Sequence, residues 1–306
     1  MTDAILEPAE IVAAKPQTPF QRFVEDFCES RLALFGLFLL ILCLFVALFA
    51  PLISPQNPFD IGALDLMDAK SPPGTVSSDG KITYWLGTDG QSRDMLSAIF
   101  YGMRTSLTVG AVSVIVALVI GIVVGLVAAY AGGGIDALLM RTVDIMLSFP
   151  AILVALILLS VMGKGVDKVL IALIIVQWAY FARAARSAAL VERNKEYVEA
   201  ATCLALPAHR IVFRHMLPNC LPSLIVIATI TLARAIALEA TLSFLGVGVP
   251  VTQPSLGMLI SNGFEFLMSG SYWISFFPGI ALAIAIVGIN LVGDHLRDIL
   301  NPRNAR

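Results

Sequence analysis

The stretch LALFGLFLLILCLFVALFAPLI, residues 32–53, decides the class of fold. It contains 22 residues and carries no charge. An α-helix rises about 1.5 Å per residue, so about 20 apolar residues cross the roughly 30 Å hydrocarbon core of a bilayer. The run is longer than the apolar segment of a cleavable signal peptide, and 31 mostly polar residues precede it. We therefore predict a membrane-spanning helix that anchors the chain.

The composition of the whole chain also indicates a membrane protein. Of its 306 residues, 58% are hydrophobic and only 14% are charged, whereas soluble domains have about 45–50% and about 25%. The mean hydropathy is +0.86. A net charge of −2 and a pI near 5.9 exclude a broadly basic nucleic-acid-binding protein. Membrane lipid is therefore an expected partner, and nucleic acid is not.

Charge-poor runs predict five more spans. The fourth of the six is only 14 residues long, and it crosses the bilayer only if Lys168 and Arg183 extend their charged ends outward. Six spans predict an all-α polytopic membrane protein. The five further spans are expected at residues 107–130, 145–163, 169–182, 221–245 and 274–293.

The distribution of basic residues orients these spans. With a cytoplasmic N-terminus, 13 of the 20 lysines and arginines lie on the inner side and 6 on the outer side. Cytoplasmic loops carry an excess of basic residues, so both termini are predicted to be cytoplasmic. The predicted regions are an inner tail 1–31, a first transmembrane helix 32–53, an outer loop 54–104, a five-helix transmembrane domain 105–293 and an inner tail 294–306.

Two segments outside the spans have local patterns. The outer loop contains Ser71-Pro72-Pro73-Gly74 and Asp89-Gly90, which favour turns, and its roughly 50 residues are expected to form a little strand and no core of their own. Near the N-terminus, Thr18-Pro19 favours a helix start. One face of that helix would then carry Phe20, Phe23, Val24 and Phe27. The pattern leaves open an interfacial helix and an unstructured tail.

Few ionisable residues lie inside the predicted spans. Arg234 and Glu239 both fall in the fifth span. They are five positions apart, which corresponds to about 140° around a helix, so they do not face each other. A proton- or ion-coupled carrier needs several such groups. The four cysteines and three histidines have no disulfide or metal-ligand spacing. We predict no catalytic, cofactor-binding or metal site, and we retain Arg234 and Glu239 as candidate functional charges.

Glycine-containing segments give no nucleotide-binding motif. Gly163-Lys164-Gly165 lacks the upstream glycine and the following Ser or Thr of a phosphate-binding loop. If transport uses ATP, another subunit must therefore bind it. Gly121 and Gly125 form a small-xxx-small pattern, which suits close helix packing either within this subunit or against another one.

The longest inner loop, residues 183–218, is a candidate docking segment. Glu199-Ala200-Ala201 lies in a helix-prone stretch where small residues allow another backbone to approach, and Glu199 offers a charge that sets register. Pro207 then turns the chain. Composition alone favours the simpler interpretation of an ordinary basic cytoplasmic loop.

The motif itself favours docking. Glu199-Ala200-Ala201, Ala205 and Leu217-Pro218 resemble the EAA loop of ABC importer permeases. The resemblance implies a coupling helix that docks into a groove on an ATPase subunit, with Ala200 and Ala201 in that groove. Ala205 stands where the family has glycine, and alanine with a positive φ costs on the order of 1 kcal/mol, so a different turn geometry is expected. His215 stands where the family has isoleucine.

Further segments resemble the dipeptide/oligopeptide type of these importers, specifically its C-type permease. Ser92 replaces a glycine of the family pattern, and Asn301 replaces an aspartate. The segments, in chain order, are LGTD at 86–89, SRD at 92–94, GMRTSL at 102–107, EATLSFLG at 239–246, GDHLRD at 293–298 and NPR at 301–303.

The resemblance implies one subunit of a five-part importer in a bacterial inner membrane. Its partners would be a second homologous permease, two cytoplasmic subunits that bind ATP and Mg, and an extracytoplasmic solute-binding protein. This chain would form half of the pathway for di- or oligopeptides or a related small solute. Two other classes of function stay open: a membrane scaffold that does not transport, and a stand-alone secondary carrier.

Overall fold

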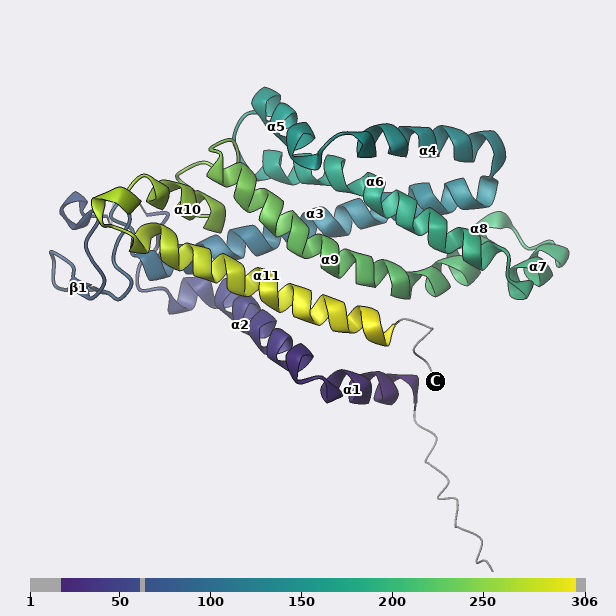
Figure 1. Cartoon of the computed structure of the whole chain (residues 1–306), viewed down its shortest axis with the longest axis horizontal. Helices are drawn as coiled ribbons and strands as arrows, with labels where there is room; N and C mark the ends of the chain where they lie inside the picture. Colours follow the sequence, from purple (N-terminus) through teal and green to yellow (C-terminus); the bar gives the residue numbers. More distant parts are fainter. Residues whose placement is uncertain (1–17, 61–63, 301–306) are drawn as a thin grey trace, which may run out of the picture.

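Helices dominate the computed structural model, which describes residues 18–60 and 64–300. Figure 1 shows an elongated bundle in which the long helices run along the longest axis. Five of them are long and apolar enough to cross a membrane, and a bent pair brings the number to six, as predicted. The five long helices are α2 (Arg31–Ile53), α3 (Met95–Ala131), α6 (Val166–Arg193), α9 (Leu217–Phe244) and α11 (Trp273–Ile299).

Several helices extend beyond the apolar runs that predicted them. Helix α3 begins at Met95, inside the segment predicted as outer loop, because Asp94 caps it: Asp94 Oδ2 accepts a hydrogen bond from the Ser97 amide at 2.8 Å. Helix α6 continues to Arg193, ten residues past the predicted start of the inner loop at residue 183. A charged residue ends an apolar run in the sequence, but the helix continues through it, so hydropathy underestimates the lengths of these helices.

The third span is not the single helix predicted over residues 145–163. It consists of α4 (Gly133–Ser148) and α5 (Ala151–Met162), which meet at an angle of 87°. Pro150 has no amide hydrogen, and it disfavours the helical conformation at Phe149, where φ is −99° and ψ is 142°. The break therefore lies at residues 149–150.

Two glycines bring α3 and α6 into backbone contact. A Cβ added at Gly121 would lie 2.3 Å from the Cβ of Phe181, and one added at Gly125 would lie 2.5 Å from the carbonyl oxygen of Ala182. No larger residue fits at either position. The small-xxx-small pattern therefore packs inside this subunit, which resolves the alternative left open by the sequence.

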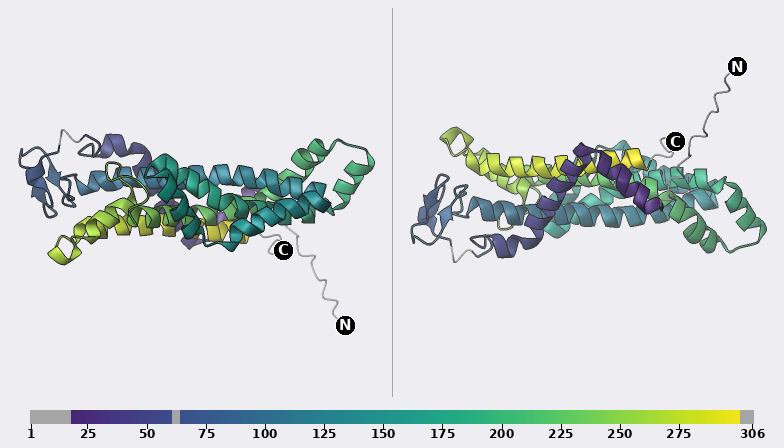
Figure 2. Two further views of the ribbon diagram at one scale, coloured as in Figure 1. Left: turned by 90° about the horizontal axis from the view of Figure 1, so that it is seen from above. Right: turned by 90° about the horizontal axis from the view of Figure 1, so that it is seen from below.

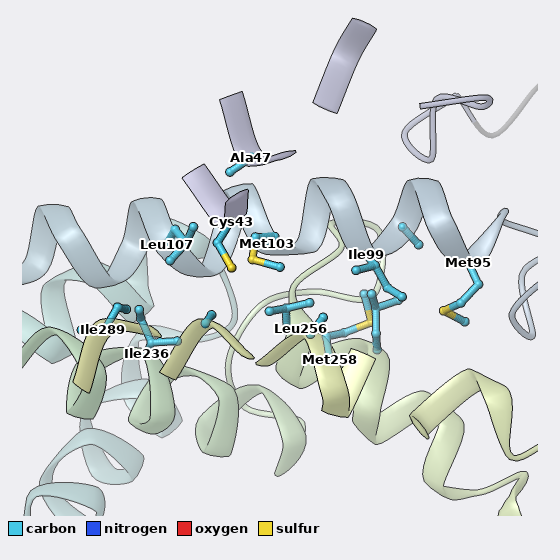
Figure 3. Close-up of a cluster of buried hydrophobic side chains, with 14 of the residues drawn as sticks. Cys43, Ala47, Met95, Ile99, Met103, Leu107, Ile236, Leu256, Met258 and Ile289 are labelled. Carbon is cyan, nitrogen blue, oxygen red and sulfur yellow. The ribbon is translucent and has the colours of Figure 1, made fainter. Parts of the chain in front are cut away.

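A hydrophobic cluster joins α2, α3 and α11 to the short helix α10 (Leu256–Phe264). Figure 3 shows side chains from α2, α3, α9, α10 and α11 in this shared interior. The labelled members are Cys43, Ala47, Met95, Ile99, Met103, Leu107, Ile236, Leu256, Met258 and Ile289. The cluster fixes the outer-loop end of the bundle.

The outer loop folds around polar side chains. It contains a turn of 3-10 helix, η2 (Leu66–Asp68), and the strands β1 (Thr75–Val76) and β2 (Thr83–Tyr84), which pair antiparallel. Asp89 and Arg93 form an ion pair at 2.6 Å, with both side chains 1% exposed. Trp273 of α11 donates from its indole nitrogen to the carbonyl of Thr88 at 3.2 Å. The loop thus has the expected short strands, and α11 holds it in place.

A short helix, α1 (Pro19–Glu29), precedes the first span. Thr18 and Gln21 form a reciprocal capping box at its start. Its other end meets α11, since the rings of Phe27 and His295 lie 5.3 Å apart. Residues 19–29 are therefore helical, and their position at a membrane surface stays a prediction.

Candidate coupling site and cavity

The predicted docking motif lies on helix α7 (Glu196–Cys203), at the end of the bundle opposite the outer loop (Figure 1). Figure 2 shows α7 and the residues after it projecting beyond the long helices. A helix of eight residues is short, so its position depends on contacts with its neighbours rather than on its own stability.

The turn that ends α7 keeps the left-handed conformation expected of glycine. Ala205 has φ +52°, so the expectation of a different turn geometry is wrong. The Leu206 amide donates to the carbonyl of Ala201 at 3.2 Å, and the Ala205 amide donates to that of Thr202 at 2.9 Å. These two bonds form a Schellman cap. They satisfy the last carbonyls of the helix and so offset the strain at Ala205.

The face of α7 that is free for a partner differs from the one predicted. Ala201 is 5% exposed and packs in a cluster with Val198, Ile211 and Val212 of its own chain, so it does not line a partner's groove. Val198 and Ala201 are three residues apart and share the inward face of the helix. Glu199 and Ala200 are exposed, and Leu204 beside them is 75% exposed.

A widened helical turn connects the motif to α9. After α8 (Ala208–Arg210), the segment η3 (Ile211–Met216) is a π-helix, in which the Leu217 amide donates to the carbonyl of Val212, five residues earlier. Pro218 has no amide hydrogen for the usual i−4 bond, and its ring would clash with the carbonyl of Arg214 in a regular α-helix. Leu217 is half-buried, and Pro218 is exposed. The Leu-Pro element therefore begins the fifth span.

A hydrogen-bonded cluster ties α7 to two spans, and sequence reasoning missed it. Glu192, at the end of α6, is 8% exposed. It accepts a hydrogen bond from the hydroxyl of Tyr197 in α7 and pairs with Lys195 at 2.6 Å. Asn219 of α9 donates to the same hydroxyl at 3.1 Å. Burial, and then the bond to Glu192, raise the pKa of Tyr197 to about 12. No spacing rule relates these residues, so only the fold reveals the cluster.

Glu239 joins several elements at the other end of α9. Its side chain is fully buried, and it accepts hydrogen bonds from the hydroxyls of Ser106 at 2.7 Å and Ser243 at 2.8 Å. Ser106 lies in α3 and also accepts from the amide of Leu256, at the start of α10, at 3.3 Å. The EATLSFLG segment thus connects α3, α9 and α10 through one carboxylate.

Arg234 lies apart from Glu239, as the spacing predicted, and lines a cavity of about 850 Å³ between α4, α6, α9 and α11. We call this space the arginine cavity. Its apolar lining consists of Leu147, Ala184, Val226, Ile227, Ile230 and Leu300, and its polar lining of Tyr180, Arg183, Ser223, Thr231, Arg234 and Arg297. Within residues 18–60 and 64–300, no three His, Cys, Asp or Glu side chains lie together as a metal site would require.

Two families match this chain. “Binding-protein-dependent transport system inner membrane component” matches residues 121–306, and “N-terminal TM domain of oligopeptide transport permease C” matches residues 18–73. The first covers the last part of α3 and all the helices after it, together with α7 and the arginine cavity. The second covers α1, α2 and the beginning of the outer loop.

Curated relatives match along almost the whole chain. The dipeptide transport system permease protein DppC of Escherichia coli K12 is 38% identical over 299 residues, which cover 98% of each chain. The di/tripeptide transport system permease protein DppC of Pseudomonas aeruginosa is 35% identical, over 94% of this chain and 93% of its own. The oligopeptide transport system permease protein OppC of Bacillus subtilis is 35% identical, over 96% and 93%.

A solved structure has the same fold. A chain of the MetNI methionine ABC transporter, in an inward-facing conformation, aligns with a TM-score of 0.56 at 23% identity and covers 68% of this chain and 99% of that chain. At this level of identity the likeness concerns the fold alone. The family match, the relatives that align along almost the whole chain and the shared fold all agree. The chain therefore belongs to the inner membrane permeases of binding-protein-dependent ABC transport systems.

Proposed function

We propose that this permease subunit forms half of the pathway of a peptide importer, and that α7 is the element through which ATP hydrolysis in a partner drives it. The observation that carries the proposal is the geometry of α7. The helix presents Glu199, Ala200 and Leu204 outward while its other face is anchored in the chain. A short, anchored helix with an exposed small residue suits docking into a groove.

The contacts of α7 support a mechanical route from a docked partner to the pathway. Tyr197 connects α7 to Glu192 of α6 and to Asn219 of α9. Both helices continue into the bundle and line the arginine cavity. A displacement of α7 would therefore tilt or slide two walls of the cavity together. Alternating access then needs no titratable relay or nucleotide site in this chain.

We infer that ATP and Mg bind to two partner ATPase subunits, and that a second homologous permease supplies the other half of the pathway. An extracytoplasmic solute-binding protein would deliver the cargo. The family described above depends on a binding protein, and the MetNI neighbour is an ABC transporter. The chain would then be a transport subunit without catalytic residues of its own.

The arrangement of the ends supports an inner-membrane orientation with both termini in the cytoplasm. Helices α1 and α7 and the last turn of α11 lie toward one end of the bundle, and the outer loop lies at the other (Figure 1). The excess of basic residues falls on the α7 side. Relatives named for di-, tri- and oligopeptides favour a peptide as the cargo.

Purification through a tag on this chain tests the proposal. We expect two ATP-binding subunits and a second permease to copurify, and the complex in proteoliposomes to import a dipeptide such as Ala-Phe when ATP and the binding protein are present. Transport by this chain alone would establish a secondary carrier instead. Copurification without any transport would favour a scaffold.

A further inference from the structure

We propose that the arginine cavity holds the carboxylate of the cargo in transit, and that Arg234 is the residue that recognises it. The inference rests on the proposed transport function, and it assigns the class of ligand and the residue that selects it. It follows from the net charge of the residues that line the cavity, from the hydrogen bonds that their hydroxyls already make, and from the position of Arg234 along α9.

The lining carries a net positive charge that is only partly compensated. Three arginines and no acidic residue line the cavity. Arg183 is paired with Asp144 of α4. Arg234 and Arg297 have no carboxylate partner in the described ranges 18–60 and 64–300. A guanidinium that faces a space inside a membrane bundle without a counter-ion is stabilised when an anion enters.

The guanidinium groups are the charged donors of the cavity, and the hydroxyl of Tyr180 is a neutral one. The hydroxyls of Ser223 and Thr231 donate to carbonyls of their own helix, to Cys220 at 2.9 Å and to Ile227 at 2.7 Å. The guanidinium carbon of Arg234 lies 5.9 Å from the centre of the Tyr180 ring, a cation–π contact that restrains it. A guanidinium matches a carboxylate through two parallel N–H···O bonds.

The depth of Arg234 favours a solute over a lipid headgroup. It lies 17 residues from the start of α9 at Leu217 and 10 from its end at Phe244, or about 25 Å and about 15 Å along the helix. In the predicted span 221–245, Arg234 lies 13 and 11 residues from the two ends, or about 20 Å and about 16 Å, whereas lipid phosphates lie at the surfaces of the bilayer. The space is partly open, and its volume of about 850 Å³ is within the range of about 300–1,000 Å³ of small-ligand sites.

Transport of two peptides that differ only in the carboxylate tests the inference. The complete importer, purified through this chain, is placed in phosphatidylcholine vesicles with its binding protein. Ala-Phe and its C-terminal amide are each supplied at a concentration that calorimetry shows to saturate the binding protein. We expect Arg234→Gln to lower the Ala-Phe uptake rate about 10- to 100-fold, Arg234→Lys to lower it less, and neither variant to change amide uptake by more than about twofold.

Controls separate this inference from the proposed function. Arg141→Gln removes an exposed charge of α4 that does not line the cavity, and it should transport both peptides normally. An equal fall for both peptides in Arg234→Gln, or no fall, overturns carboxylate recognition while peptide transport by the wild type stands. A fall that appears only when phosphatidylglycerol is added assigns Arg234 to lipid and also overturns it. If the wild type transports neither peptide, the proposed function itself fails.

Discussion

Tyr197 donates a hydrogen bond to Glu192, and this bond joins the exposed helix α7 to the end of α6. The carboxylate of Glu192 is 8% exposed and has Lys195 as its second partner. Because Asn219 of α9 donates to the same hydroxyl, one side chain connects three helices. Beside the apolar packing of Val198 and Ala201, this hydroxyl is therefore a polar connection through which a movement of α7 would reach two spans.

Tyr197→Phe tests this connection. The change removes the hydroxyl and leaves the ring, so Glu192 loses one donor at a cost of about 1–3 kcal/mol. We expect normal insertion and normal retention of the ATPases, with peptide uptake per ATP hydrolysed reduced about three- to tenfold. Uptake and hydrolysis are measured in the same vesicles. Tyr272→Phe, at an exposed residue of the outer-loop end, is the matched control, and equal behaviour of the two variants would contradict the role of Tyr197.

Ala200→Trp and Ala201→Trp should have different consequences, because the two residues are about 100° apart around α7 and only Ala201 is buried. Ala200 is exposed, so its replacement should leave the thermal stability of the purified chain unchanged and reduce ATPase copurification. Ala201 is 5% exposed, and overpacking there should destabilise the chain by about 1–3 kcal/mol. Normal copurification with Ala200→Trp would exclude this face of α7 as the docking surface.

Glycine should stabilise two turns that hold other residues in a left-handed conformation. Ala205 has φ +52° and Ser92 has φ +60°. Glycine adopts such a conformation without the steric cost, but it raises the entropy of the unfolded chain. We expect Ala205→Gly to raise the unfolding free energy by about 0.5–1 kcal/mol. Ser92→Gly should follow the same direction, and a fall in thermal stability in both variants would show that neither turn is strained.

Asp94 should make the start of α3 sensitive to pH. Burial raises the pKa of this carboxyl, while bonds from Ser97 and Leu96 partly oppose the rise. A carboxyl with a raised pKa in the folded state favours folding most when it is protonated, so its contribution is lost as the pH rises through the folded value. We expect the wild type to gain stability on acidification from pH 7 relative to Asp94→Asn. Thermal unfolding of both proteins at several pH values measures this, and parallel curves would contradict it.

Single cysteines at positions 81 and 194 test the orientation. Lys81 is an exposed residue of the outer loop, and Asn194 is exposed beside α7. In a background without Cys28, Cys43, Cys203 and Cys220, an impermeant thiol reagent added to intact cells should label Lys81→Cys and not Asn194→Cys. The opposite labelling pattern would show that the topology is inverted. Labelling of both positions would show that the chain has no single orientation.

The sequence predicts what depends on hydropathy. The run at residues 32–53 matches α2 almost residue for residue, because an apolar stretch of that length has no other stable environment. Hydropathy does not predict where helices end beyond the apolar run, since Arg193 continues α6. Pro150 favours a break in the third span, but hydropathy does not show this break because the residues on both sides of it are mostly apolar.

The candidate site is predictable only as a motif. Glu199, Ala200 and Ala201 identify α7, but which of the two alanines faces outward depends on Ile211 and Val212, which pack beneath the helix. In the cluster around Glu192, Tyr197 is 5 positions from Glu192 and 22 positions from Asn219 in sequence. Such pairings arise from tertiary packing, and no local pattern encodes them.

The contact at Gly121 determines which parts of the bundle can act as a hinge. With no side chain between Gly121 and the backbone of Phe181, α3 and α6 pack backbone to backbone, so a displacement that α7 passes to α6 is expected to carry α3 with it. The width of the arginine cavity would then change as this pair of helices moves relative to α9 and α11. In the proposed transport cycle, the break at residues 149–150 and the π-helical segment at residues 211–216 are the places where this part of the bundle would bend.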